Sequence, residues 1–310
     1  MINKNSKIFV AGHKGLVGSS IIRTLKKKGF KKIITIEKKK LDLRNQFKVF
    51  KFIKKKKPSA IIICAAKVGG IKVNYKKKAE FIYDNLAIQN NLIHGAYINK
   101  INKLIFLGSS CIYPKFSRQP IKEKYLLEGP LEKTNEPYAI AKIAGVKLCE
   151  SYNDQFNTNY ICLMPSNLFG PNDNYDLQNS HFFPAIIRKL YEAKKKNKKE
   201  VKFWGTGNAM RELTFVDEVA EACIFFLNKN IKHPLINLGS GYERNIKSYI
   251  NFVAKKIGVN SKISFDSNKI FDGVPRKIVD TKIARNYGWR PIFDFNKAFD
   301  ITYADFLKKN

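Results

Sequence analysis

The chain has 310 residues, of which 44% are hydrophobic, and its 58 Lys and Arg against 25 Asp and Glu give a net charge of +33. It is long enough to bury a large core, in one unit or in two lobes. It has no apolar run of about 18 residues, so we expect no membrane span and no membrane partner. The five cysteines are scattered, odd in number and without metal-ligand spacing, which predicts reduced thiols in a cytoplasmic protein and no metal site.

The positive charge admits two interpretations. A strongly basic chain is typical of nucleic-acid-binding proteins. Here, however, the lysines form short runs at expected helix ends and loops (26–28, 38–40 and 54–57), and arginine is sparse. No aromatic residues interleave a basic ribbon, so we expect no nucleic-acid partner. An anionic small-molecule ligand gains from such a field in any case.

A glycine-rich loop follows the first predicted strand. Apolar residues 7–11 lead directly into Gly12, Gly15 and Gly18, and a helical pattern covers 19–28. Glycines in this context let the backbone approach a pyrophosphate, and the helix N-terminus offers free N–H groups and a positive dipole. The spacing is G-x-x-G-x-x-G, and any tight turn between a strand and a helix can use glycine. The context favours a nucleotide.

The end of the second predicted strand, 31–36, carries conflicting charges. Glu37 stands where a carboxylate accepts from a ribose 2′-hydroxyl, which favours NAD. Lys38 and, in the first loop, Lys14 would instead pair with a 2′-phosphate, which favours NADP. The alternative is that all are solvated turn residues. The turn at 41–43 suggests that Asp42 lies near the adenine.

The next predicted elements alternate between helix and strand. Helices are expected over 46–56, 79–98 and 138–152, and strands over 58–66, 104–108 and 159–164. Such alternation predicts an α/β fold with a Rossmann-type, doubly wound parallel sheet and right-handed crossovers. Ligands in this architecture bind beyond the carboxyl ends of the strands, where the loops after these strands would meet.

The pattern changes after residue 170. A polar loop, a basic helix over 185–196, a strand over 201–204 and a helix over 246–257 predict a smaller, discontinuous C-terminal substrate lobe. We expect a nucleotide-binding domain formed by 1–166 plus 213–245, with 235–241 as one more strand of its sheet. The substrate lobe would then comprise 167–212 plus 246–310.

Three residues suggest a proton-transfer site. Tyr138 and Lys142 lie one helical turn apart and so share a face, and Ser109 follows a buried strand. A phenol has a pKa near 10, which a neighbouring ammonium would lower, giving a usable acid. A serine hydroxyl can bind the same carbonyl oxygen. The alternative for Tyr138 and Lys142 is an ordinary surface pair on a helix.

A second set of residues has weaker support from the sequence. Cys111 lies two residues past Ser109 and could be a small buried filler, and His181 could be a helix cap. A thiol and an imidazole on opposite sides of a keto-sugar would be a base and an acid for protons next to the ketone. Spacing alone does not bring them together.

Longer strings carry a resemblance to a known family. They are Ala11-Gly-His-Lys-Gly-Leu-Val-Gly-Ser19, Ala65-Ala-Lys-Val-Gly-Gly-Ile71, Leu107-Gly-Ser-Ser-Cys-Ile-Tyr-Pro-Lys115, Thr134-Asn-Glu-Pro-Tyr-Ala-Ile-Ala-Lys-Ile-Ala-Gly145, Asn179-Ser-His181, Met210-Arg-Glu212 and Gly273-Val-Pro-Arg-Lys277. With these strings, which span nearly the whole chain, the protein resembles the extended short-chain dehydrogenase/reductases. Within them it is similar to the bifunctional 3,5-epimerase/4-reductases that convert GDP-4-keto-6-deoxy-D-mannose to GDP-L-fucose.

The resemblance implies an NADPH-dependent oxidoreductase and isomerase. Ser109, Tyr138 and Lys142 would form the reductase triad, and Cys111 and His181 would be the epimerisation base and acid. A homodimer would form through helices 79–98 and 138–152. Cofactor contacts are implied at Gly12, Lys14, Gly15, Leu16, Val17, Gly18, Lys38, Asp42, Ala65, Ala66, Tyr138, Lys142, Pro165, Asn167, Leu168 and His181. Substrate contacts are implied at Ser109, Asn167, Lys189, Trp204, Arg211 and Lys277.

Three alternatives stay open. The substrate could be another GDP-4-keto sugar, a deoxy-heptose or a dideoxy-hexose, because only the pocket around 166–212 would differ. One half-reaction could be lost, although both residue sets are present. The third is a non-catalytic basic binding protein on a Rossmann scaffold, against which the intact Gly12, Tyr138 and Lys142 argue.

Overall fold

The computed structural model describes residues 1–231, 234–266, 273–292 and 294–310. Its larger part is built on a six-stranded sheet in the order β2-β1-β3-β4-β5-β9, in which every pair is parallel. The predicted Rossmann-type fold is confirmed. The chain runs from β1 out to β2 and then back to β3, so the switch point lies between β1 and β3, where doubly wound folds bind ligands. The strands are β1 (Ile8–Ala11), β2 (Ile33–Ile34), β3 (Ala60–Ile63), β4 (Lys103–Leu107), β5 (Asn159–Pro165) and β9 (Leu235–Leu238).

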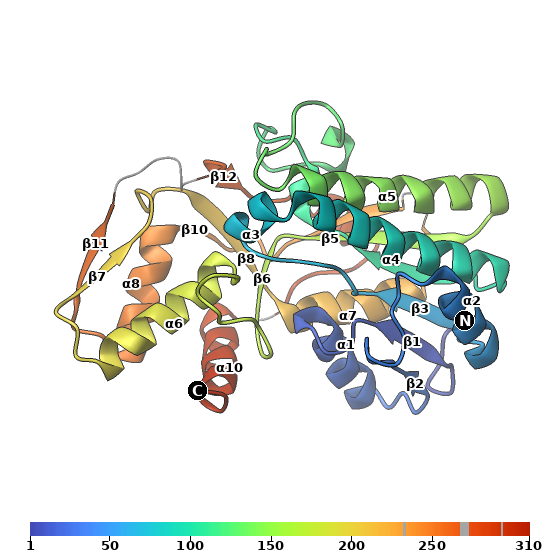
Figure 1. Cartoon of the computed structure of the whole chain (residues 1–310), viewed down its shortest axis with the longest axis horizontal. Coiled ribbons are helices and arrows are strands. Elements are labelled where there is room, and N and C mark those ends of the chain that lie inside the picture. The colour runs from blue at the N-terminus through green and yellow to red at the C-terminus, as the bar shows by residue number, and fades with distance from the viewer. Residues whose placement is uncertain (232–233, 267–272, 293) are drawn as a thin grey trace.

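Helices cover both faces of this sheet (Figure 1). Strand side chains alternate between two apolar cores, so Phe9 and Phe106 pack on one face while Ile8 and Ile105 pack on the other. The central strands are buried on both faces, and their continuous apolar runs follow from that. The first face carries α2 (Gln46–Lys56), α4 (Lys78–Ile98) and α5 (Glu136–Phe156), and the second carries α1 (Leu16–Lys27) and α7 (Val216–Leu227).

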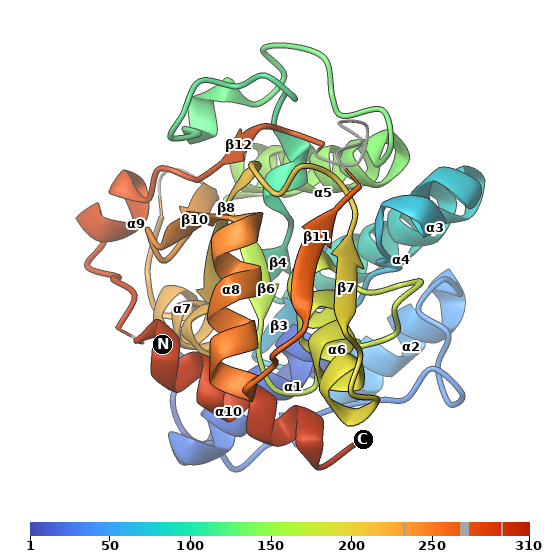
Figure 2. The ribbon, with the colours of Figure 1, turned by 90° about the vertical axis from the view of Figure 1, so that its left-hand side faces the viewer.

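A smaller lobe lies beyond the carboxyl ends of the strands (Figures 1 and 2). Strand β8 pairs with β10, β12 and β6, a parallel pair joins β11 to β7, and aromatic side chains dominate the core. No helix among the described residues has the length and apolar character needed to cross a membrane. The elements of this lobe are β6 (Asn167–Phe169), α6 (Phe182–Lys195), β7 (Glu200–Phe203), β8 (Met210–Phe215), β10 (Glu243–Asn245), α8 (Ile246–Ile257), β11 (Lys262–Phe265), β12 (Arg276–Lys277) and α10 (Phe295–Leu307).

Several elements differ from the predictions. The second strand is only two residues long, and the residues after β4 form a short 3-10 helix, η1 (Ser110–Ile112), before η2 (Glu123–Tyr125). A short helix, α3 (Ile71–Lys76), precedes α4. Helix α9 (Lys282–Asn286) packs into the core of the larger part through Ala284, and Trp289, which follows the helix, enters the same core. Both lie within the range expected for the substrate lobe. Apolar patterning could not show which of the two cores would receive these side chains.

Candidate active site

The glycine loop after β1 is shaped for a dinucleotide. Gly12 has a φ of +85°, and a Cβ there would lie 2.6 Å from the backbone nitrogen of Ala65, at the end of β3. A Cβ on Gly18 would collide with the carbonyl oxygen of Gly12. Helix α1 begins directly after Gly15, and no side chain caps it. Its first N–H groups are thus available to an anion, so the residues fit the pyrophosphate of a dinucleotide cofactor.

The charges after β2 form a pair. Lys14 Nζ lies 2.7 Å from Glu37 Oε1, and both side chains are largely exposed. The hydrogen bond and charge of Lys14 lower the pKa of Glu37, with smaller effects from Lys40 and His13. The carboxylate that favours NAD and the loop ammonium that favours NADP are therefore engaged with each other.

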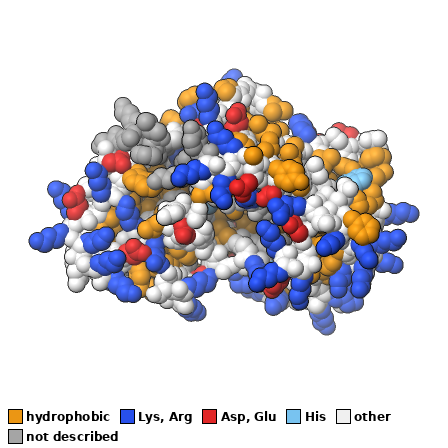
Figure 3. Space-filling view, viewed as in Figure 1, with side chains coloured by type: hydrophobic (Ala, Val, Ile, Leu, Met, Phe, Trp, Pro, Cys, Tyr) orange, Lys and Arg blue, Asp and Glu red, His pale blue; other side chains and the backbone are white. Residues whose placement is uncertain are grey.

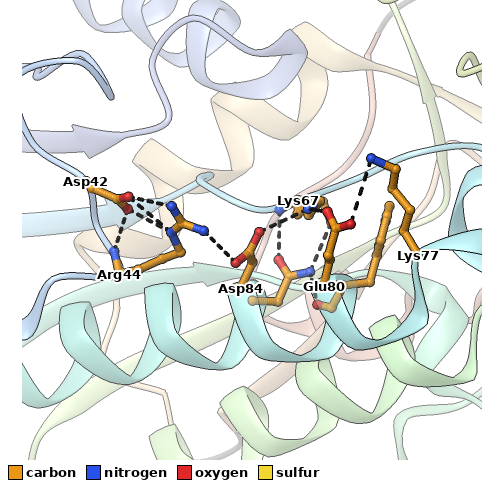
Figure 4. A network of polar contacts seen from close by, with 8 residues as sticks. Asp42, Arg44, Lys67, Lys77, Glu80 and Asp84 are labelled. Carbon is orange, nitrogen blue, oxygen red and sulfur yellow. Dashed lines mark hydrogen bonds and ion pairs between the residues drawn. The ribbon is translucent and has the colours of Figure 1, made fainter.

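Asp42 belongs to a chain of ion pairs (Figure 4). Arg44 binds both carboxylate oxygens of Asp42 and also Asp84 on α4, at 2.9 Å. Asp84 in turn accepts from Lys67, which also pairs with Glu80. The Arg44 hydrogen bonds lower the pKa of Asp42 to about 2. The network ties the loop after β3 to the loop after β2, and sequence reasoning missed Arg44 and Asp84 because no local pattern connects them.

Ser109 and Cys111 share the turn that ends β4. Ser109 is the N-cap residue of η1, and its Oγ accepts from the backbone N–H of Cys111 at 3.4 Å. The thiol of Cys111 lies 3.1 Å from the same oxygen. Both residues are partly accessible. The hydroxyl and the thiol can thus meet one small ligand.

Lys142 and Tyr138 lie beside this turn. Lys142 is 3% exposed, donates to the carbonyl oxygen of Leu107 at 2.7 Å and lies 5.9 Å from the centre of the Tyr138 ring. Burial lowers the pKa of Lys142 to about 8. Burial, with a contribution from Cys111, raises the pKa of Tyr138. In the chain by itself, desolvation therefore outweighs the lowering of the phenol pKa that we expect from the neighbouring ammonium. The phenol keeps its proton at neutral pH, as a proton donor to a ketone must.

His181 reaches the same region from the smaller lobe. The backbone N–H of Gly70 donates to Asn179 at 3.0 Å, which holds the start of α6 against the loop after β3. Desolvation by the surrounding atoms and then the charge of Lys277 lower the pKa of His181, although its side chain keeps access to solvent. Burial lowers the pKa of Lys277, and Cys111 acts in the opposite direction. Cys111, Lys277 and His181 therefore share one electrostatic neighbourhood, although far apart in sequence.

The other predicted contacts divide into two groups. Asn167 follows Pro165 at the end of β5 and donates to the backbone of β8, and Leu168 and the site residue Arg211 lie in the paired strands β6 and β8. Lys189 instead bonds the carbonyl oxygen of Lys202 and lies over the ring of Phe203, and Trp204 is 54% exposed beyond β7. Within the described part of the chain, no contact joins Lys189 or Trp204 to Cys111 or Tyr138.

Metal ligation has no support at this site. Among the described residues, no group of three or more His, Cys, Asp and Glu could hold a metal ion. The side chains available here are a thiol, an imidazole, a phenol, a hydroxyl and two cations. Such a set can move protons at carbon and oxygen.

Comparison with known proteins identifies the family of this chain. Residues 8–239 match the NAD dependent epimerase/dehydratase family. A putative GDP-L-fucose synthase 2 from Arabidopsis thaliana is 46% identical over 99% of this chain and 94% of its own length. The GDP-L-fucose synthase of Escherichia coli (strain K12) is 42% identical over 97% of each chain.

A solved structure gives the same result. MlghC, a GDP-mannoheptose C4 reductase from Campylobacter jejuni with NADP bound, superposes with a TM-score of 0.90 at 33% identity, over 99% of this chain and all of its own. The likeness in sequence and structure thus extends over both lobes. The chain therefore belongs to the NAD dependent epimerase/dehydratase family, in the branch that contains the GDP-L-fucose synthases.

Proposed function

We propose that this protein converts GDP-4-keto-6-deoxy-D-mannose to GDP-L-fucose in two steps, 3,5-epimerisation and then 4-keto reduction with NADPH. The observation that carries the proposal is the meeting of two residue sets. Ser109, Tyr138 and Lys142 suit reduction and lie around the turn after β4. Cys111 and His181 suit epimerisation; Cys111 lies in the same turn, and Lys277 links it electrostatically to His181. The likeness to named GDP-L-fucose synthases over the full chain supports the choice of sugar.

In the first step, Cys111 acts as a thiolate and removes the protons at C3 and C5 of the sugar, and His181 delivers protons to the opposite face. Each exchange moves one proton off carbon and one back, so no redox change occurs. Ser109 and Tyr138 donate hydrogen bonds to the C4 oxygen, which carries enolate charge while a proton is away. The thiol and the hydroxyl are already adjacent, with Cys111 Sγ 3.1 Å from Ser109 Oγ.

In the second step, Tyr138 gives its proton to the C4 oxygen, and Ser109 keeps that oxygen in place. When bound at the glycine loop, NADPH would provide the hydride for C4. The ammonium of Lys142, which is fixed by the Leu107 carbonyl, offsets the negative charge left on the phenol. Gly12, Gly15 and the first turn of α1 would hold the cofactor pyrophosphate, and Lys38 together with Lys14 would face the 2′-phosphate.

The two residue sets can be tested separately. A Cys111→Ser variant should stop taking up solvent deuterium at C3 and C5, and a Tyr138→Phe variant should lose reduction by about 10²–10⁴-fold while it still exchanges deuterium. Wild-type exchange in the first variant, or wild-type reduction in the second, would remove the role assigned to that residue.

A second candidate is reduction of another GDP-4-keto sugar. The similarity to the GDP-mannoheptose C4 reductase favours it, because that protein covers the same length with the same fold. A panel of GDP-4-keto sugars, a deoxy-heptose and a dideoxy-hexose included, should be offered with NADPH and with NADH, and the products identified by NMR. A higher kcat/KM for a sugar other than the 6-deoxy-mannose derivative would select this candidate.

The organisation of the protein is part of the proposal. Residues 1–166 plus 213–245 would bind the cofactor, and 167–212 plus 246–310 would bind the sugar nucleotide. All five cysteines are unpaired, which suits a reducing compartment, and we place the protein in the cytoplasm.

We also propose that two copies associate through α4 and α5. These neighbouring helices expose apolar side chains, and hydrophobic atoms are visible over them between basic residues in Figure 3. Ile140 is 42% exposed and Tyr83 is 68% exposed there. Ile140→Asp should give monomers in sedimentation experiments, whereas Leu177→Asp, at 44% exposure in the other lobe, should leave the association state unchanged. Equal behaviour of the two variants would count against this interface.

A further inference from the structure

Glu212 on β8 is a fully buried carboxylate with two backbone donors. Its Oε1 accepts from the N–H of Gly241 at 2.7 Å, and its Oε2 accepts from the N–H of Val279 at 3.0 Å. The two donors lie in separate parts of the chain, the turn after β9 and the segment after β12. A Cβ on Gly239 would collide with this carboxylate, so the turn closes tightly around it. One side chain thus joins three segments.

The proposed sugar-nucleotide contacts gather around this position. Arg211 is the preceding residue, and the register of β12 on β8 places Lys277 opposite it. Asn167 donates through Nδ2 to the backbone carbonyl of Glu212 at 2.9 Å. Asn167, Arg211 and Lys277 come from distant stretches of sequence. Glu212 accepts from Asn167, follows Arg211 in the chain and accepts from Val279, two residues after Lys277.

Strand β12 needs support from outside itself. It is two residues long, Arg276–Lys277, and two residues provide few ladder hydrogen bonds. After it, Ile278 accepts from Ile121 at 2.8 Å, and Val279 donates to Glu212. The segment is thus held between β8 and the loop that follows Cys111. Further anchors are the N–H of Asp280, which donates to Ile121 at 2.8 Å, and the N–H of Ile278, which donates to Gln119 at 3.0 Å. The Glu212 bond to Val279 is the anchor that ties this segment to β8 directly beside Arg211.

The environment of the carboxylate fits this anchoring role. Burial raises the pKa of Glu212 to about 7, and the N–H groups of Val279 and Gly241 act in the opposite direction. Burying a carboxyl group costs desolvation free energy, which an apolar residue of the same volume would not cost. Its two backbone hydrogen bonds are what the acid provides here.

We propose that Glu212 is a positioning residue for the sugar-nucleotide site: its carboxylate holds β12 so that Lys277 stands beside Arg211 and Cys111. The proposal rests on the proposed function, because it takes Lys277 and Arg211 as contacts of the bound sugar nucleotide. It concerns how these cations are held, and it gives Glu212 no contact with the reacting atoms.

The test is the Glu212→Gln variant. A glutamine keeps the volume, but its NH₂ group faces one of the two backbone donors, so one segment is released. We expect the KM for the keto-sugar and the Kd for GDP, measured by calorimetry, to rise about tenfold, with the KM for NADPH within about twofold of wild type. An unchanged Kd for GDP, or an equal rise in the KM for NADPH, would overturn the proposal.

A matched control is available on α7. Glu218 is also buried, at 3% exposure, and accepts from the backbone N–H of Ile292 at 2.8 Å, away from the site. Glu218→Gln should leave the Kd for GDP unchanged even if it lowers stability. A similar loss of GDP affinity in both variants would show a general effect of buried acids and contradict the assignment.

A double-mutant cycle separates positioning from folding. Lys277→Met should itself weaken GDP binding, and Glu212→Gln added to it should weaken binding less than about twofold further. Fully additive losses would contradict the proposal. If Glu212→Gln does not fold, Glu212→Asp, which keeps the charge on a shorter chain, is judged by the same criteria. The Kd for GDP can be measured whichever sugar the wild type converts. A wrong assignment of the sugar substrate would therefore appear in the turnover assays and not in the GDP affinities.

Discussion

Burial of the Lys142 ammonium should make the stability of this protein depend on pH in a predictable direction. The pKa of Lys142 falls from 10.5 to about 8 because the side chain is desolvated. The folded protein therefore binds fewer protons than the unfolded chain between these values, and its stability rises with pH there. At neutral pH the charged group costs about 3 kcal/mol, from roughly 1.4 kcal/mol for each pKa unit.

Lys142→Met removes this cost while it keeps most of the volume. It also removes the hydrogen bond to the Leu107 carbonyl, which costs about 1–3 kcal/mol. The two effects nearly cancel at neutral pH, so we expect a folded variant of similar stability that has lost ketone reduction. The stability of wild type minus that of the variant should rise by about 2 kcal/mol between about pH 6.5 and about pH 9.5.

Urea unfolding of both proteins at matched pH values is the assay. Other titrating groups contribute equally to both proteins, so they cancel in the difference. A difference that stays flat with pH would refute the reasoning, as would one that falls, because either result means that the folded protein does not disfavour the Lys142 charge.

Three further predictions concern other parts of the site. Gly12→Ala should weaken NADPH binding at least about tenfold in a fluorescence titration, because the positive φ and the close approach of Ala65 leave no room for a Cβ; unchanged affinity would contradict the loop assignment. Asn172→Ala should cost about 1–2 kcal/mol in urea unfolding, since the Asn172 amide donates to the backbone of Lys14 at 2.7 Å, and equal midpoints would show that this contact is not formed. Lys277→Met should raise the pKa of His181 part of the way to its usual value, because one of the two causes that lower it is removed. If the pKa of His181 measured by NMR titration is the same in both proteins, Lys277 does not act on His181.

Local sequence patterns alone determined most of the secondary structure and the fold class of this protein. The glycine loop, the buried strands and the amphipathic helices follow from periodicity over a few residues, and the parallel sheet follows from their alternation. The approach of Lys142 to the end of β4 was predictable too, because its helix α5 connects β4 with the neighbouring strand β5 of the same sheet. The strings that carry the family resemblance are equally local.

Other features depended on contacts between distant segments. The approach of His181 to Lys277 and Cys111 depends on the packing of α6 against the loop after β3, and the placement of Lys277 depends on the two-residue strand β12. The direction of the Tyr138 pKa shift in the chain by itself also depends on folding, because desolvation is a property of the packed interior. These contacts and the desolvation of Tyr138 arise only when the chain folds, because burial and strand register are set by residues far away in the sequence.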